Sequence, residues 1–287
     1  MINQQLSRYA THDNSAYPSL WRGCVGAWCP SLGPSGSRLH DYSRRQNWGT
    51  LTNMDPATDW VVDGGAYALD FDGSNDVVSV GSGRSGLVNL PTSGFSVSLW
   101  INIRSAGGNS VGTIIDNYNA ANSQPGWYFL IRSVGGNTLA AQAGAGFTPT
   151  NQTQISADNF FTLNQWDHIT LAFDASSKVF ALYRNGTQIS FPVNSSASAT
   201  YNDDSGQSLV IGNRAAGDRA LDGLLDDVRV YGRVLSFAEQ RLLSRRRGIA
   251  FTPRSRRLGV IEQAAGGATP WLYARRRSQI IGSGGVH

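Results

Sequence analysis

Three kinds of side chain are nearly absent from this chain of 287 residues: cysteine, lysine and glutamate. Its two cysteines, Cys24 and Cys29, have an odd spacing that predicts opposite faces of one strand, which excludes a disulfide framework or a zinc site. No apolar run approaches the roughly 18 residues that cross a bilayer, so no membrane partner is expected. The first residues lack the basic-then-apolar order of a secretory signal, which predicts assembly inside a cell unless export takes another route.

Charge is unevenly distributed along the chain. Residues 1–240 carry 14 Arg and Lys against 19 Asp and Glu, whereas residues 241–287 carry ten Arg against one Glu. Lys178 is the single lysine, so almost every cation is an arginine, which forms planar bidentate contacts with carboxylates and phosphates. The pattern predicts a basic C-terminal arm that binds a partner.

Between Gly23 and Tyr231, short apolar runs alternate with Gly, Asn, Asp and Ser turns, the pattern of an antiparallel sandwich. A period of two is clear in residues 95–103, and it recurs in 169–173, 179–183 and 224–230. Ser236 and Glu239 form a capping box, which predicts one short helix ending near Gly248. The expected organisation is an N-terminal arm (1–22), a β domain (23–248) and a C-terminal arm (249–287).

Seven segments, in order, carry a resemblance to a known family. They are Gly23–Trp28, Asp41–Leu51, Leu69–Asp76, Phe95–Trp100, Trp166–Thr170, Leu182–Gly186 and Asp222–Tyr231. In sequence and order they resemble the laminin-G-like, concanavalin A-like jelly roll. The resemblance implies an all-β antiparallel jelly-roll sandwich, with one short C-terminal helix and extended arms outside the family pattern.

The same fold also occurs in glycoside hydrolases, which set paired glutamates on one strand. The two glutamates here, Glu239 and Glu262, lie in the terminal helix and the arm. Adjacent aspartates such as Asp226 and Asp227 would point oppositely in a strand. The sequence therefore predicts a protein without catalytic activity.

Two kinds of ligand site remain open. One structural Ca²⁺, as jelly rolls of this type often carry, would use Asp41, Asp226 and Asp227, although these aspartates could equally cap turns. Exposed aromatic side chains would suit sugar stacking, although one sequence does not separate exposed from covered rings. The candidates for glycan binding are Trp100, Tyr118, Trp127 and Tyr201.

The arm supplies the candidates for partner binding. An acidic protein surface fits it better than nucleic acid does, because few aromatics accompany the arginines. The trio at 271–273 sits beside an arginine cluster, a composition enriched in interface hot spots. The candidates are Arg245, Arg246, Arg247, Arg254, Arg256, Arg257, Trp271, Leu272, Tyr273, Arg275, Arg276 and Arg277.

Two functions follow from these features. The first is a virion structural protein, a capsid decoration or cement protein of a tailed phage assembled in the host cytoplasm; it would be homo-oligomeric and attached to a capsid or other virion protein through its arms. The alternative is a lectin-like carbohydrate-binding module for surface glycans. Deletion of residues 249–287 is expected to leave a folded sandwich that no longer joins its assembly.

Overall fold

Two eight-stranded sheets and a small third one make up the structure, a computed structural model that describes residues 14–119, 124–136, 138–155, 158–189, 197 and 200–254. The first sheet has the order β15 (Thr187–Ile189), β14 (Val179–Arg184), β13 (Trp166–Asp174), β7 (Phe95–Ile103), β18 (Asp222–Tyr231), β5 (Ala66–Asp72), β4 (Trp60–Asp63), and β1 (Cys24–Trp28) pairs with β18. The second has the order β12 (Gln152–Ile155), β10 (Thr138–Ala145), β9 (Trp127–Gly135), β8 (Val111–Asp116), β17 (Leu209–Ile211), β6 (Val77–Gly81), β3 (Gly49–Thr52), β2 (Arg38–Leu39). The third pairs β11 (Phe147–Thr148) with β16 (Thr200–Tyr201).

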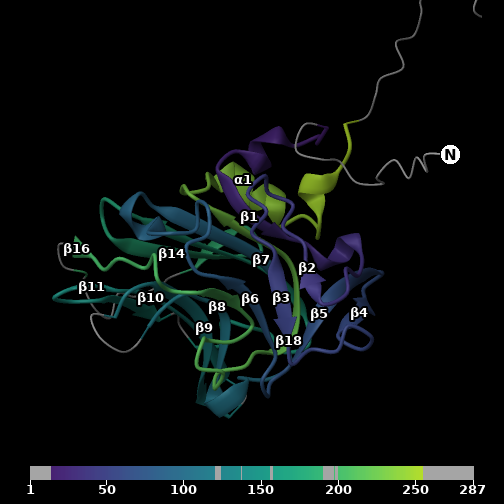
Figure 1. Cartoon of the computed structure of the whole chain (residues 1–287), viewed down its shortest axis with the longest axis horizontal. Helices are drawn as coiled ribbons and strands as arrows, with labels where there is room; N and C mark the ends of the chain where they lie inside the picture. Colours follow the sequence, from purple (N-terminus) through teal and green to yellow (C-terminus); the bar gives the residue numbers. More distant parts are fainter. Residues whose placement is uncertain are drawn as a thin grey trace, which may run out of the picture. The chain divides into compact units, whose positions relative to one another are not determined.

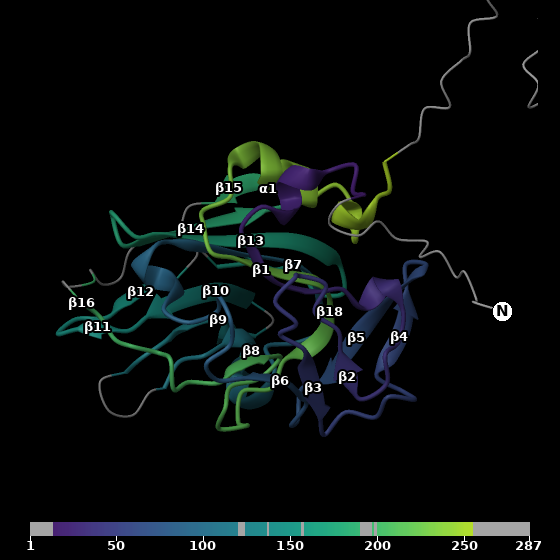
Figure 2. The ribbon, with the colours of Figure 1, turned by 45° about the horizontal axis from the view of Figure 1, so that its top comes forward.

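The two large sheets stack as a sandwich, which is seen best when the molecule is tilted (Figures 1 and 2). Neighbouring strands pair antiparallel, as the sequence predicts; β13, for example, pairs with β7 on one side and β14 on the other. Asn185, with φ of 50°, and Gly186 make the predicted turn after β14. The all-β jelly-roll fold is therefore confirmed.

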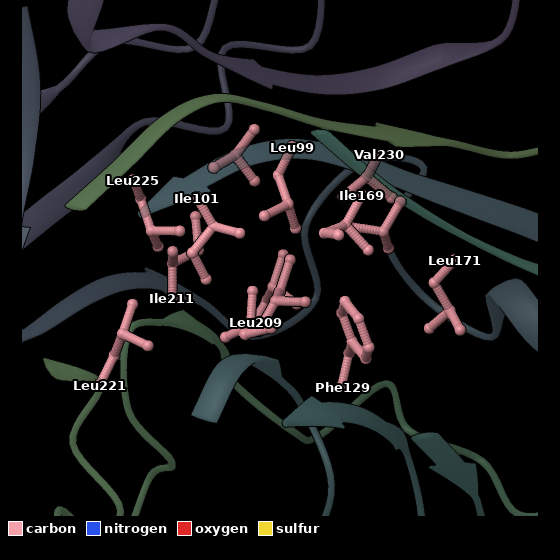
Figure 3. Close-up of a cluster of buried hydrophobic side chains, with 14 of the residues drawn as sticks. Leu99, Ile101, Phe129, Ile169, Leu171, Leu209, Ile211, Leu221, Leu225 and Val230 are labelled. Carbon is pink, nitrogen blue, oxygen red and sulfur yellow. The ribbon is translucent and has the colours of Figure 1, made fainter. Parts of the chain in front are cut away.

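The main core lies between the sheets, where side chains of β7, β13 and β18 meet those of β9 and β17 (Figure 3). On β7 the residues predicted to share one face all enter this core: Phe95, Val97, Leu99, Ile101 and Ile103. Strands alternate their side chains between faces, so the remaining residues of β7 lie on the outer face of the first sheet.

A β-bulge in β18 changes the face on which its residues lie. The register with β7 shifts between Asp226 and Arg229, and Asp227 adopts a left-handed φ of 47°. Before the bulge Leu225 enters the core, whereas after it Val228 and Val230 do. The uninterrupted period of two predicted for residues 224–230 is therefore wrong, because one extra residue reverses the alternation.

A second apolar cluster covers the outer face of the first sheet beside β1 and β18. It joins η1 (Pro18–Trp21), α1 (Phe237–Leu243) and η5 (Ile249–Phe251). These short helices lie together above β1 in Figure 2. The predicted capping box is confirmed, since the Ser236 side chain accepts from the Glu239 amide and the Glu239 side chain from the Ser236 amide. Cys29 belongs to this cluster and Cys24 borders it, so the expected separation onto opposite faces does not occur; both are free thiols.

Both domain boundaries differ from the expected ones. Residues 14–22 and 249–254, which the sequence assigned to the arms, are packed against the β domain. Ser15 bridges Pro253, and the Ala16 amide donates to the Thr252 carbonyl at 2.8 Å. Buried aromatic rings explain the difference, because Trp21 and Phe251 contact each other at 5.0 Å between ring centroids.

The other short helices are η2 (Pro30–Leu32), η3 (Leu90–Thr92) and η4 (Gly108–Ser110). In the described part of the chain, every helix is too short or too polar to cross a membrane.

Candidate functional site

A cleft of about 400 Å³ hollows the outer face of the second sheet over β8, β9 and β10. Phe129 and Ile131 of β9 enter the core, so Tyr128, Leu130 and Arg132 face the cleft. The loop between β17 and β18 forms another wall. Polar and aromatic residues dominate the lining, chiefly Asp116, Tyr118, Tyr128, Arg132, Gln142, Arg214 and Arg219.

The position of the Tyr128 ring depends on a glycine, Gly144, which has no side chain to occupy the same space. Gly144 lies opposite Tyr128 on β10, and a Cβ at Gly144 would come within 2.4 Å of the Tyr128 ring and hydroxyl. The ring therefore lies across β10, where its hydroxyl accepts a hydrogen bond from Gln142 Nε2 at 3.0 Å. Tyr118 meets it edge to face at 5.1 Å between centroids. The two rings and the amide form one preorganised surface.

Asn213 holds the loop that carries two of the arginines. Its side chain is buried, and its Oδ1 accepts from the amides of Arg214 at 2.8 Å and Arg219 at 3.1 Å. The carbonyl of Arg219 in turn accepts from the Thr113 amide of β8 at 2.9 Å. The backbone of this loop is thus fixed against the sheet.

Among the described residues, Asp116 is the single carboxylate in the lining of the cleft. Its Oδ1 accepts from the Tyr118 amide at 2.5 Å, and only 5% of the residue is exposed. Burial raises the pKa of Asp116 to about 7, against the opposing effect of Arg214 and Arg219. Below that pH the carboxyl is largely neutral.

The three arginines of the cleft differ in how their charge is balanced. Arg214 forms an ion pair with Asp218 through its Nε and Nη2 atoms, so its charge is largely compensated. Arg132 and Arg219 are partly exposed, and within the described residues neither guanidinium has an ion pair or hydrogen bond. The cleft therefore has a net positive charge when Asp116 is protonated.

A second hollow of about 250 Å³ adjoins the cleft. It is lined by residues of the loops around η4 and the β9–β10 turn, and it shares Ser110 and Ser133 with the first. The two hollows therefore share part of their lining, and the second adds volume beside the first.

The four residues predicted to bind glycans do not lie together. Tyr118 lines the cleft, but Trp127 is fully buried in the core, so it cannot stack on a ligand and that prediction is wrong. Trp100 lies on the outer face of the first sheet against His168, at 5.3 Å between ring centroids. The Tyr201 hydroxyl donates to Asp204 at 2.7 Å beside the third sheet. Sequence reasoning missed Tyr128, because large side chains alternate on both faces of β9.

The three aspartates predicted to bind calcium occupy two separate places. Asp41 accepts four hydrogen bonds, from the amides of Ala27, Ser43 and Asn47 and from the Ser43 hydroxyl, at 2.6–2.8 Å. This is the turn-capping alternative, since the protein's own donors occupy both oxygens. In the described ranges, no group of three or more His, Cys, Asp or Glu could hold a metal ion.

Asp226 and Asp227 belong instead to a buried ion cluster with Arg229 and Arg247, beneath the second apolar cluster. Arg229 donates through Nε to Asp227 at 2.7 Å, and its guanidinium packs against the rings of both Trp21 and Phe251, at 4.8 and 4.9 Å from their centroids. Burial alone would lower the pKa of Arg229, but the neighbouring charges, chiefly Asp227, raise it.

Asp226 is also fully buried in this cluster. Burial and then the charge of Asp227 raise the pKa of Asp226 to about 7. Its Oδ1 accepts from the amides of Ser31 at 3.0 Å and Asp227 at 2.8 Å, and Oδ2 lies 3.7 Å from Arg247 Nε. The expectation that Asp226 and Asp227 point oppositely fails at the bulge, because both carboxylates lie in the ion cluster.

The arginines predicted to bind a partner are only partly described. Arg247 stacks on Trp166 at 4.3 Å, Arg246 donates to Thr252, and Arg254 donates to the Ser15 carbonyl at 3.0 Å, all within the chain, whereas Arg245 is exposed. The rest of that prediction lies outside the described residues, namely Arg256, Arg257, Trp271, Leu272, Tyr273, Arg275, Arg276 and Arg277.

Comparison with known proteins identifies the family of the chain and bears on its fold. Residues 72–239, more than half of the chain, match the family described as the concanavalin A-like lectin/glucanases superfamily. No curated protein matches the sequence.

Several solved structures are similar in fold. The receptor-binding domain of botulinum neurotoxin C/D mosaic serotype has 16% identity and a TM-score of 0.55, over 78% of this chain and 51% of that one. The binding domain of Paraclostridial mosquitocidal protein 1 has 18% identity and a TM-score of 0.52, over 78% and 52%. A Trypanosoma rangeli sialidase with the inhibitor DANA has 13% identity and a TM-score of 0.55, over 77% and 32%. The chain thus spans a third to a half of these proteins, and at such identities the likeness shows the fold alone.

Proposed function

Since the chain belongs to the concanavalin A-like lectin/glucanases superfamily, we propose that it is a non-catalytic saccharide-binding domain whose ligand lies in the cleft over β8, β9 and β10. A fold alone does not assign a function, so the proposal depends on the site.

The observation that carries the proposal is the surface made by Tyr118, Tyr128 and Gln142. Aromatic rings offer an apolar face to the C–H side of a sugar, while fixed polar groups bond its hydroxyls. Here the rings contact each other and the amide is held by the Tyr128 hydroxyl, so little ordering remains for the ligand to impose.

The absence of catalysis is proposed from the acids of the cleft. Hydrolysis of a glycosidic bond ordinarily needs two carboxyl groups on either side of that bond. Of the residues that the structure describes, Asp116 is the one carboxylate that lines the cleft, and Glu239 is held on α1 by Arg233 at 2.7 Å. A single acid with raised pKa can donate a proton, but the described lining of the cleft offers no second carboxylate to complete the reaction.

The similar structures support binding in a general way. Two of them are a receptor-binding domain and a binding domain, and the third is a sialidase of which this chain covers 32%. We propose that this chain shares the binding role and lacks the activity of the longer enzyme.

The test is a glycan array with the full chain and two glycine variants. Gly144→Ala places a methyl group where the Tyr128 ring lies, so binding should fall by about tenfold or more. Gly206→Ala is the matched control, because a Cβ there meets nothing within 4 Å, and it should bind as the native chain does. Equal binding by both variants would remove the cleft from the proposal, and no binding to any glycan would remove the function.

The virion function remains a prediction of the sequence. Most of its supporting residues, in 1–13 and 255–287, lie outside the described residues. The capsid partner, the homo-oligomer, the virion location and the structural Ca²⁺ are proposals in the same sense. A decoration protein that also binds host glycans would satisfy both functions.

A further inference from the structure

The charge of the cleft points to the kind of saccharide it binds, an inference that rests on the proposed function. Arg132 projects from β9, whereas Arg219 comes from the loop between β17 and β18, so the two approach the cleft from different elements. In the described part of the chain neither has a carboxylate within ion-pair distance, although Arg214 beside them is paired with Asp218.

Unpaired arginines are common on protein surfaces, but these two line a cleft beside a preorganised aromatic pair. A guanidinium presents a planar fork of donors that matches a carboxylate, and charge-assisted bonds are stronger than those to a sugar hydroxyl. Partly sheltered cations gain more from an anionic ligand than fully exposed ones do, because water screens them less.

Asp116 would oppose an anionic ligand only when it is ionised. It lines the cleft together with Tyr118 and Tyr128, and the charges of Arg214 and Arg219 act on it. Its burial favours the neutral acid, which adds no negative charge to the site.

We infer that the cleft binds a saccharide bearing a carboxylate, whose acid group pairs with Arg132 and Arg219 while its ring contacts Tyr118 and Tyr128. The adjoining hollow extends the site past Ser110 and Ser133, which favours an oligosaccharide over a single sugar.

Calorimetric titration of the full chain with matched probes tests this inference. Tetragalacturonic acid and 3′-sialyllactose represent two sources of a sugar carboxylate, and the methyl ester of each is its neutral control. At least one acid should bind about tenfold or more tightly than its ester. Stronger binding of a sulfated disaccharide than of either acid would contradict the assignment of a carboxylate.

Variants then connect the preference to the two arginines. Arg132→Gln and Arg219→Gln should each remove most of the difference between acid and ester. Arg22→Gln removes the same charge from an exposed position at the end of η1, and it should leave the difference unchanged. If neutral glycans bind as well as acids and both cleft variants bind normally, the inference fails while the proposed function stands; if no glycan binds, both fail.

The pH dependence gives an independent readout. Affinity for the acid probe should fall as pH rises through about 7. Ionised Asp116 then repels the carboxylate of the ligand and competes with it for the positive charge of Arg219. Asp116→Asn keeps an acceptor for the Tyr118 amide and should abolish this decrease. An unchanged decrease in Asp116→Asn would contradict the role given to this acid.

Discussion

The outer faces of the two sheets both carry arginines beside a buried aspartate whose pKa is raised to about 7, yet they differ in what covers them. In the buried ion cluster, η1 and η5 cover Arg229 with the rings of Trp21 and Phe251. The charge of Arg229 therefore interacts with groups of the protein itself. In the cleft Arg132 and Arg219 stay partly exposed, and among the described residues neither guanidinium has an ion-pair partner. Arginines beside a buried aspartate therefore stabilise the fold where other segments of the protein cover them. Where they stay partly exposed, as in the cleft, they are available to a ligand.

The largest expected effect comes from uncovering the ion cluster. A chain that ends at Arg254 keeps η5, whereas one that ends at Arg247 loses Ile249 and Phe251 and the Gly248 amide that donates to Asp227 at 3.0 Å. We expect the shorter chain to lose at least about 5 kcal/mol of unfolding free energy, and the longer one to match the full chain in urea denaturation.

This pair of truncations also replaces the expectation that deletion of residues 249–287 leaves a folded sandwich. Equal urea midpoints for the two shortened chains would show that η5 does not hold the ion cluster closed, and the contrast with the cleft would lose its basis.

Removing an arginine from each face sharpens the comparison. Arg229→Ala leaves Asp227 as a buried charge without its partner, which should cost about 3–5 kcal/mol of stability. Arg132→Ala removes a partly exposed side chain and should change stability by less than about 0.5 kcal/mol. Similar losses in the two variants would mean that Arg132 is also structural.

The buried aspartate of the ion cluster should appear in the pH dependence of stability. Because folding raises the pKa of Asp226 to about 7 from an unfolded value near 3.9, the folded state holds more protons between these values, and stability falls as pH rises from about 4 to 7. Asp226→Asn should reduce that fall by on the order of 3 kcal/mol. Exposed Asp158→Asn is the control, and a slope unchanged by Asp226→Asn would contradict the burial of an ionisable group there.

The smallest expected change in stability comes from removing one of two tyrosine hydroxyls, one in each region. Tyr231→Phe in the second apolar cluster leaves the buried Leu20 carbonyl without its donor, bonded at 3.0 Å, and should cost about 1–2 kcal/mol. Tyr128→Phe in the cleft should cost less than about 0.5 kcal/mol of stability, because Gln142 can bond to water instead, but it should weaken glycan binding several-fold. Thermal unfolding and titration measure the two effects separately.

The strands and α1 could be predicted from sequence because their patterns are local. The alternation in β7 and the box of Ser236 and Glu239 each lie within a few residues. The bulge at Asp227 could not be predicted in this way. An aspartate in the left-handed conformation has no distinctive sequence pattern, yet it reverses which sheet face each later residue of β18 occupies.

The cleft was largely hidden for a different reason. Tyr118 was predicted as an aromatic candidate. Trp127 and Tyr128 are adjacent residues on opposite faces of β9, and the sequence does not say which of the two aromatic side chains is buried. Arg132 and Arg219 lie far apart in the chain and meet the same cleft only after the sandwich forms. The position of η5 depended on a long-range contact with Trp21 that no local pattern encodes.

The bridge between Ser15 and Pro253 has a topological consequence. The Arg254 amide donates to the Asn14 carbonyl at 2.9 Å, so the two ends of the described chain lie side by side and the path is close to a ring. A short linker across that gap, with the chain reopened in the exposed turn at Ser176 and Ser177, would permute the order of the strands without changing any pairing between them. In such a permutant the ion cluster would be sealed by internal segments of the chain, and its closure would no longer depend on two segments that fold down from the ends.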